Sequence, residues 1–383
     1  MDFGLSKENE MIRKEVRKFV QAEIMPVAEA LDRSGEYPYE ILTKMGNLGF
    51  MGIPFPEAYG GTGGDWVGMH VCIEEVSRGD IAVGLALDAS ISLVAQEIYT
   101  FGSEEQKQKW LVPLLTGVQI GAFALTEADA GSDAGAIQAT AAKDGDEWVL
   151  NGTKQFISII GMDSASLMIV AAVSGKNKDG NIISTFIVPK SAAGFSLGQR
   201  YRKLGMMSSA THEVILEDCR IPQEYILGHP DRGFAQHLTV LETGRITVAA
   251  MSVGLAQACL DEALSYAKKR HQFGKPIFDF QAVQFKLADM AVGIELARNQ
   301  YLKAAWLKDQ GKKHTFEATA AKLYASEMVE KVASDALQIH GGYGYMEEYP
   351  VSRYYKAAKL NQIIEGTSEV QRMIIGRILS GRT

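Results

Sequence analysis

The segment Asn361-Gln-Ile-Ile-Glu-Gly-Thr-Ser-Glu-Val-Gln-Arg372 joins an apolar run, an acidic residue and the start of a helix in one short stretch. Ser368 and Gln371 have the S-x-x-Q spacing of a capping box, which predicts that a helix begins at Ser368. Helical periodicity extends from about Phe234 to the end of the chain. The expected helices, near 234–270, 280–309, 315–341 and 350–380, are long enough for a four-helix bundle.

Glu365 is the residue of this segment with the clearest chemical use. It precedes Gly366, at a bend where a side chain can project into a cavity without interrupting a helix. If Ile363 and Ile364 desolvate it, the carboxylate has a raised pKa and is a stronger base near neutral pH. A solvated loop residue, or the first-turn acid of a helix, is the simpler interpretation of the spacing alone.

The chain before residue 231 has two further parts. Residues 1 to about 120 have helical periodicity, with Ser6 as an expected N-cap. Beyond Ile120, short runs of β-branched or alternating residues predict strands, and Asn151-Gly152 is typical of a hairpin turn. We expect a mainly α fold with a middle β domain, built as an antiparallel sheet or barrel. The expected domains are 1–120, 121–230 and 231–383. Parallel βαβ units are absent, which excludes a Rossmann nucleotide fold.

The composition is that of an ordinary globular protein, with 383 residues, 46% of them hydrophobic and 22% charged. A net charge of −7 gives no support for a nucleic acid or membrane-surface partner. The 3 cysteines and 7 histidines show no ligand spacing, so no metal site is expected. The N-terminus has no leader-like pattern and no apolar run reaches membrane-spanning length, so we expect a cytoplasmic protein without a membrane span.

Three other segments suit a phosphate or a flat ligand. Ala124–Asp133 ends a predicted strand in small and hydroxyl residues, and Lys269–Pro276 places Arg270 at a helix end before a glycine turn. Gln338–Gly344 offers open backbone amides at another helix end. Each segment also fits an ordinary turn or helix C-terminus.

These motifs, taken together and in this order, resemble the acyl-CoA dehydrogenase family over essentially the whole chain, of a short-chain or alicyclic type. They are LTEADAGSD (125–133), KQFIS (154–158), RHQFGKP (270–276), QIHGGYG (338–344) and IIEGTSEVQR (363–372). The resemblance implies helical, β and four-helix-bundle domains, a homotetramer, bound FAD and an electron-transferring flavoprotein as electron acceptor. It also implies that Glu365 removes the α-proton of an acyl-CoA thioester while a hydride passes from Cβ to flavin N5, giving an enoyl-CoA.

The resemblance also assigns ligand contacts to individual positions. Those matching FAD contacts are Phe123, Leu125, Thr126, Phe156, Ser158, Arg270, Phe273, Gln338, Gly341, Gly342, Thr367 and Glu369. Those matching substrate contacts are Ser132, Glu242, Arg245, Ile364 and Gly366. Some relatives carry the base where this chain has Gly244, so Glu365 has no rival there. Gly84 replaces an Arg of glutaryl-type members, which argues against a dicarboxylic substrate.

Asp88 departs from the pattern of the family. By its spacing from Phe101-Gly102 it falls in the helix that lines the acyl pocket, where relatives usually have small or apolar residues. A carboxylate in a pocket built for hydrocarbon needs a partner or a purpose. Asp88 either points elsewhere and is satisfied by a neighbour, or acts as a second base. In the second case the substrate is a cyclohexane- or cyclohexene-carboxyl-type thioester, and a 1,4-elimination replaces the α,β reaction.

Two alternatives to a dehydrogenase stay open on the sequence. An acyl-CoA oxidase would pass its electrons to oxygen, but oxidase chains usually add a C-terminal helical domain, and this chain ends at Thr383. A non-catalytic acyl-CoA-binding flavoprotein would use the same fold, and the intact Glu365 argues against it.

Overall fold

The computed structural model of the chain describes residues 4–178 and 180–381. The outermost residues of the first and last expected domains, 1–3 and 382–383, therefore lie outside it. Helices form the N-terminal part: α1 (Lys7–Phe19), α2 (Ala28–Ser34), α3 (Tyr39–Asn47), α4 (Trp66–Gly79), α5 (Ile81–Leu87), α6 (Gln96–Phe101), α7 (Glu104–Gln106) and α8 (Val112–Leu115). The predicted N-cap of α1 is confirmed, because the Ser6 side chain accepts a hydrogen bond from the Asn9 backbone N–H at 3.1 Å.

The middle part is a sheet of eight strands: β1 (Ile120–Ala124), β2 (Thr140–Asp144), β3 (Glu147–Ser158), β4 (Ala165–Asn177), β5 (Gly180–Pro189), β6 (Phe195–Arg200), β7 (Thr211–Pro222) and β8 (Ile226–Leu227). They are ordered β6-β7-β3-β2-β4-β5-β8, with β1 also paired to β4. The β1–β4 and β2–β4 pairs are parallel, so the sheet is mixed and not closed into a barrel. The expectation of an antiparallel sheet or barrel was therefore wrong. Alternating residues reveal a strand, but they carry no information about the direction of its partner.

The predicted hairpin turn at Asn151-Gly152 was also wrong. Both residues lie inside β3, whose register with β7 shifts between Leu150 and Gly152, as at a β-bulge. A Cβ at Gly152 would come within 2.6 Å of the Ala139 Cβ, so glycine serves a close approach of two backbones. The chain reverses instead between β2 and β3, where Gly145 has φ 61°.

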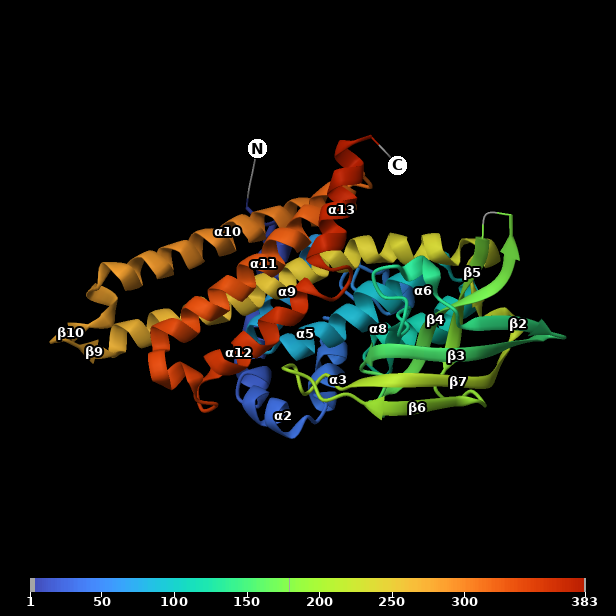
Figure 1. Cartoon of the computed structure of the whole chain (residues 1–383), viewed down its shortest axis with the longest axis horizontal. Helices are drawn as coiled ribbons and strands as arrows, with labels where there is room; N and C mark the ends of the chain where they lie inside the picture. The colour runs from blue at the N-terminus through green and yellow to red at the C-terminus, as the bar shows by residue number, and fades with distance from the viewer. Residues whose placement is uncertain (1–3, 179, 382–383) are drawn as a thin grey trace.

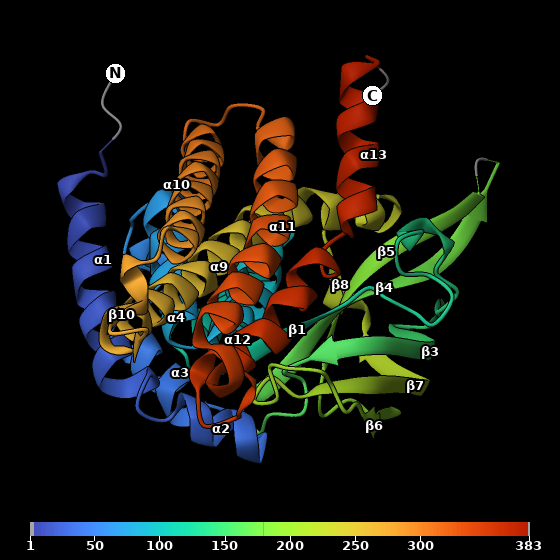
Figure 2. The ribbon, with the colours of Figure 1, turned by 60° about the vertical axis from the view of Figure 1, so that its left-hand side comes forward.

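The C-terminal part is again helical, with α9 (Gly233–Lys269), α10 (Gln281–Asp309), α11 (Thr315–His340), α12 (Pro350–Ala358) and α13 (Ser368–Leu379). A short ribbon, β9 (His271–Gln272) and β10 (Lys275–Pro276), joins α9 to α10 at the end of the molecule opposite the large sheet (Figure 1). Helices α9 to α12 pack together, whereas α13 leaves the bundle and rises beside α11 (Figure 2). The helix expected at 350–380 is therefore interrupted, and Glu365 lies in the interruption.

Thr367, and not the predicted Ser368, is the N-cap of α13. Its side-chain oxygen accepts a hydrogen bond from the Val370 backbone N–H at 3.3 Å. Gln371, the other half of the predicted capping box, is buried and directs its amide toward the backbone carbonyls of Glu365 and Gly366. The capping spacing thus located the helix within one residue but assigned the glutamine to the wrong partner.

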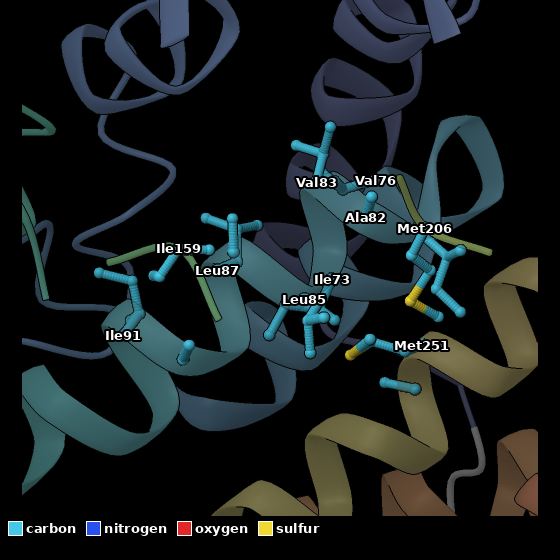
Figure 3. Packing of buried hydrophobic residues seen from close by; sticks show 14 of the residues in the cluster. Ile73, Val76, Ala82, Val83, Leu85, Leu87, Ile91, Ile159, Met206 and Met251 are labelled. Atoms are coloured by element: carbon cyan, nitrogen blue, oxygen red, sulfur yellow. The ribbon is translucent and has the colours of Figure 1, made fainter. Parts of the chain in front are cut away.

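The core lies where the two helical parts and the sheet meet. Leu87 and Ile91, either side of Asp88 in the chain, are fully buried. Figure 3 shows them in a cluster with Ile159, at the end of β3, and Met251 of α9. Helix α9 comes very close to α4, since a Cβ on its Gly254 would lie 2.2 Å from the Glu74 carbonyl oxygen. The site described below is built into this junction.

Two helical runs, Ile81–Phe101 and Pro230–Lys269, are long and apolar enough to cross a membrane by length and composition alone. Their apolar windows are 100% and 78% buried inside the protein, as in the core helices of a globular fold. The absence of a membrane span stays a prediction.

Candidate active site

Glu365 lies in a strained turn that directs its side chain inward. Its φ is 52° and that of Gly366 is 90°, two consecutive left-handed conformations. A left-handed residue other than glycine costs on the order of 1 kcal/mol and is concentrated at functional sites. Both carboxylate oxygens are buried, and apart from the carboxyl group of Asp88 described below they have no hydrogen-bond partner. Burial raises the pKa of the carboxyl group. Ile363, however, is 54% exposed and so does not desolvate Glu365 as expected, whereas Ile364 is half-buried.

Helix α9 supplies the wall against which the carboxylate rests. A Cβ added to Gly244 would lie 1.7 Å from the Oε2 atom of Glu365 and 3.0 Å from Leu93. Any other residue at position 244 would therefore displace the glutamate. Gly244 therefore leaves Glu365 without a rival base at that position. Because Gly244 has no side chain, it also leaves the space that the Glu365 carboxylate occupies.

Asp88 faces Glu365 from the N-terminal part of the chain. It is 1% exposed and begins a π-helical segment, Asp88–Ala95, that joins α5 to α6 without a break. Segments of this kind are rare and frequent at functional sites. Burial, and then the carboxyl group of Glu365, raise the pKa of Asp88 well above its usual value. The charge of Glu365 therefore opposes ionisation of Asp88, whereas a hydrogen bond from Asp88 lowers the pKa of Glu365 and partly offsets the effect of burial on it.

Two buried cations flank the carboxyl pair. Arg245 follows Gly244 on α9, and its Nε atom is buried without a hydrogen-bond partner. Burial lowers the pKa of its guanidinium group, while the carboxylates of Glu242 and Glu365 raise it. Lys322 of α11 is 0% exposed and donates to the Gly366 carbonyl oxygen at 2.7 Å. Four ionisable groups from four parts of the chain thus meet in the interior.

The edge of the sheet carries an open aromatic face. Phe156, near the end of β3, has φ 62° and is 63% exposed, with its ring tilted against Tyr201 at 5.2 Å. Phe123 is half-buried and contacts His237 edge-on at 5.1 Å. Ser158 shares a hydrogen bond with Thr211 at 3.2 Å. Leu125 and Thr126, which follow β1, are buried and half-buried. A flat face with nearby hydroxyls suits a planar ring ligand.

A second predicted group lies at the far end of the molecule (Figure 1). It comprises Arg270, Phe273, Gln338, Gly341 and Gly342. Phe273 is 92% exposed with φ 52°, and the Arg270 guanidinium lies 5.6 Å above the Tyr343 ring. Helix α9, with 37 residues and so about 55 Å long, runs from beside β5 to this group. The large sheet lies at the other end of the molecule, so the chain does not bring this group together with the aromatic face (Figure 1).

The other predicted site residues have mixed positions. Glu369 and Ser132 are exposed, and Ile364 is half-buried. Glu242 accepts a hydrogen bond from the Thr315 hydroxyl at 2.7 Å. Within residues 4–178 and 180–381, no three His, Cys, Asp or Glu side chains are arranged to hold a metal ion.

Two polar residues of the site escaped the sequence analysis. Lys322 and Gln371 are both fully buried, and both donate to the Gly366 carbonyl oxygen. For Lys322 a signal existed, since the lysine stands at a core-facing position among alanines in the helical pattern. The role of Gln371 was missed because the residue was interpreted as part of a capping box.

The chain has a helical part, a sheet and a second helical part, with a buried carboxylate and an open aromatic face. This is the organisation of a flavin-dependent dehydrogenase. Family models for the acyl-CoA dehydrogenase N-terminal, middle and C-terminal domains match residues 6–118, 122–219 and 231–380. The chain belongs to the acyl-CoA dehydrogenase family, whose members are FAD-dependent oxidoreductases that dehydrogenate acyl-CoA thioesters.

Individual relatives cover the whole chain. It is 52% identical to a probable acyl-CoA dehydrogenase of Bacillus subtilis, over 99% of this chain and 100% of that protein. It is 43% identical to the caffeyl-CoA reductase-Etf complex subunit CarC of Acetobacterium woodii, over 98% of both chains. The solved butyryl-CoA dehydrogenase of Megasphaera elsdenii has a TM-score of 0.96 and 42% identity, covering 99% of this chain and 100% of that one.

The residues present fit FAD. Phe156 offers an exposed flat face beside Ser158 and Thr126, as an isoalloxazine ring requires. Arg270 and the open backbone at Gly341 and Gly342 suit a pyrophosphate, which needs a guanidinium and unhindered amides.

Proposed function

We propose that the chain dehydrogenates an acyl-CoA thioester with Glu365 as the base that removes the α-proton. The observation that carries this proposal is the carboxylate itself, whose oxygens are buried in the space left by Gly244. An α-proton of a thioester is too weakly acidic for a solvated carboxylate. Burial raises the pKa of Glu365 and so brings its proton affinity closer to that of the substrate. Bound FAD supplies the acceptor for the hydride that leaves Cβ.

The chain also offers a donor for the thioester oxygen. Among residues 4–178 and 180–381, no protein acceptor is recorded for the Glu365 backbone N–H. In the family the corresponding N–H donates to the thioester carbonyl, and a free donor at this point would stabilise the developing enolate. Arg245 would add positive charge close by.

The direct test is an anaerobic absorbance titration of the purified protein with butyryl-, octanoyl-, glutaryl-, cyclohexanecarboxyl- and cyclohexene-carboxyl-CoA. We expect a flavin band that one of these thioesters bleaches. Peroxide formation in air would instead favour the oxidase alternative. A protein without flavin that also fails to take up FAD would contradict the proposal.

Gly244→Ala is expected to lower the rate of flavin reduction about 100-fold, because displacing a catalytic group by about 1 Å costs this much. The new Cβ would overlap the Glu365 carboxylate. Stopped-flow absorbance with the best thioester measures the rate. Gly376→Ala on α13 is the matched control, since a Cβ there meets nothing within 4 Å, and it should react like the wild type. A wild-type rate for Gly244→Ala would mean that the carboxylate acts from another place.

A second candidate activity is favoured by the pairing of Asp88 with Glu365. We infer that Asp88 serves as an additional base, removing a proton further along an alicyclic acyl group in a 1,4-elimination. Its buried carboxyl group lies next to that of Glu365, and the acyl pocket expected there would otherwise need only hydrocarbon surface.

We further propose a homotetramer. Phe156 lies on β3 and Arg270 directly before β9, in separate parts of the molecule, so a second copy has to bring an Arg270 group to each Phe156 face if one FAD is to contact both (Figure 1). The outer face of α10 carries Phe285, Val292 and Leu296, all exposed in the single chain, as expected of a subunit interface. Light scattering that reported a monomer would contradict this assembly.

One relative suggests the electron acceptor. We propose an electron-transferring flavoprotein as partner, by analogy with the Etf-complex subunit of Acetobacterium woodii, and a cytoplasmic location. We also propose the domain division at 1–120, 121–230 and 231–383. Failure of every such flavoprotein to reoxidise the reduced enzyme would exclude that partner.

A further inference from the structure

Lys322 is a buried cation that is hydrogen-bonded to a backbone carbonyl group and not to a carboxylate. It lies on α11 with its side chain fully enclosed, and its one recorded hydrogen bond is to the Gly366 carbonyl oxygen at 2.7 Å. Burying an ammonium group is costly unless its position has a use. Burial lowers the pKa of Lys322 to about 8, so the side chain is still mostly protonated at pH 7.

The Gly366 carbonyl belongs to the strained turn that carries Glu365. Two side chains donate hydrogen bonds to this turn, Lys322 from α11 and Gln371 from α13. The Gln371 amide lies 2.9 Å from the backbone carbonyl oxygen of Gly366 and 3.2 Å from that of Glu365. Since the left-handed conformation of Glu365 is unfavourable on its own, the hydrogen bonds to the carbonyl oxygens of this turn help to select it.

The charge of Lys322 also acts on the carboxyl pair. The groups that face it are Glu365, Arg245 on α9, Glu369 on α13 and Glu327 on α11 itself. The pKa of Glu365 is lowered in turn by a hydrogen bond from Asp88 and by the charges of Lys322 and Arg245. The charge of Arg245 is shared with the carboxylate of Glu242, whereas Lys322 is bonded to the residue directly after the base.

We propose that Lys322 is a positioning residue for the reaction: its ammonium group fixes the turn that aims Glu365, and its positive charge keeps that carboxylate ionised beside Asp88. Without Lys322, only Arg245, whose charge is shared with Glu242, would oppose the uptake of protons by the two buried carboxyl groups, and Glu365 would lose its ionised form at a higher pH. This proposal rests on the proposed role of Glu365.

The test follows proton removal without hydride transfer. The holoenzyme is incubated in D₂O with 3,3-dimethylbutyryl-CoA, a thioester with no hydrogen on Cβ, so that its only reaction is loss and regain of the α-proton. Mass spectrometry gives the exchange rate between pD 5 and 9. In the wild type we expect the rate to fall on the acid side as Glu365 becomes protonated.

Three substitutions separate the bond from the charge. Lys322→Met removes both, Lys322→Gln keeps a donor for the Gly366 carbonyl without the charge, and Lys322→Arg keeps the charge. We expect the acid limb of the exchange profile to move up by at least one pH unit in the Met and Gln variants, and to stay within about 0.3 units in the Arg variant. Lys331→Met, an exposed site on the same helix, is the control and should leave the profile in place.

An acid limb that stays in place in both the Met and the Gln variants would overturn the proposal, even if the maximal rate fell, because lost rate alone is a structural effect. If the Met variant does not fold, the Gln variant decides. Absence of exchange in the wild type, with this thioester and with butyryl-CoA, would instead count against the role of Glu365 itself.

Discussion

Glu365→Gln is expected to slow the reduction of bound flavin by an acyl-CoA thioester about 10⁴-fold, the upper end of what a positioned general base contributes. The amide has nearly the shape of the carboxylate and would fit the space beside Gly244, so the fold and the flavin content should not change. It has no accessible proton affinity near neutral pH. The α-proton would then have no acceptor at the position of the Glu365 carboxylate.

Anaerobic stopped-flow absorbance gives this rate, and the flavin spectrum of the resting protein checks that the cofactor is bound. Glu347→Gln makes the same chemical change at an exposed position and serves as the control. The wild-type rate should also fall in acid, since protonation of Glu365 removes the base, and the raised pKa places that fall closer to neutrality than for an ordinary glutamate. A Gln variant that kept a tenth of the wild-type rate would show that another group is the base.

Asp88→Asn is expected to lower turnover of a cyclohexene-carboxyl thioester about 10³-fold more than turnover of a saturated thioester of similar size. Asparagine keeps a donor that can bond Glu365 but cannot accept a proton. A reaction that needs one base, at Cα, would lose only the contribution of Asp88 to the environment of Glu365. A reaction that needs a second base would lose its acceptor.

The ratio of the two rates is the decisive quantity in this experiment, because it cancels losses from folding or from flavin binding. Ser90→Ala supplies a control in the same π-helical segment, where a buried hydroxyl bonds the Gly121 backbone and not Glu365. Equal losses on both substrates would mean that Asp88 acts only through Glu365, and the 1,4-elimination would be abandoned.

Local patterns were sufficient for most of the helical fold. The apolar period located α9, α10 and α11 within a residue or two, and the Ser6 cap located the start of α1. Each of these signals depends on side chains a few positions apart, so it can be read from the chain before folding. The strands were found in the same way, but their directions were not.

The family motifs likewise predicted Glu365 as the base, and the anomaly at Asp88 was visible as a charged residue in an apolar run. What no local pattern could show is that the two carboxyl groups meet, since they come from opposite ends of the chain. Gly244 fits closely against Glu365, and Lys322 of α11 is buried beside the Glu365 turn. Both features arise where α9, α11 and that turn converge. Proton affinity depends on that convergence, because the charges and the dielectric around a carboxyl group are set by neighbours in space and not by neighbours in sequence.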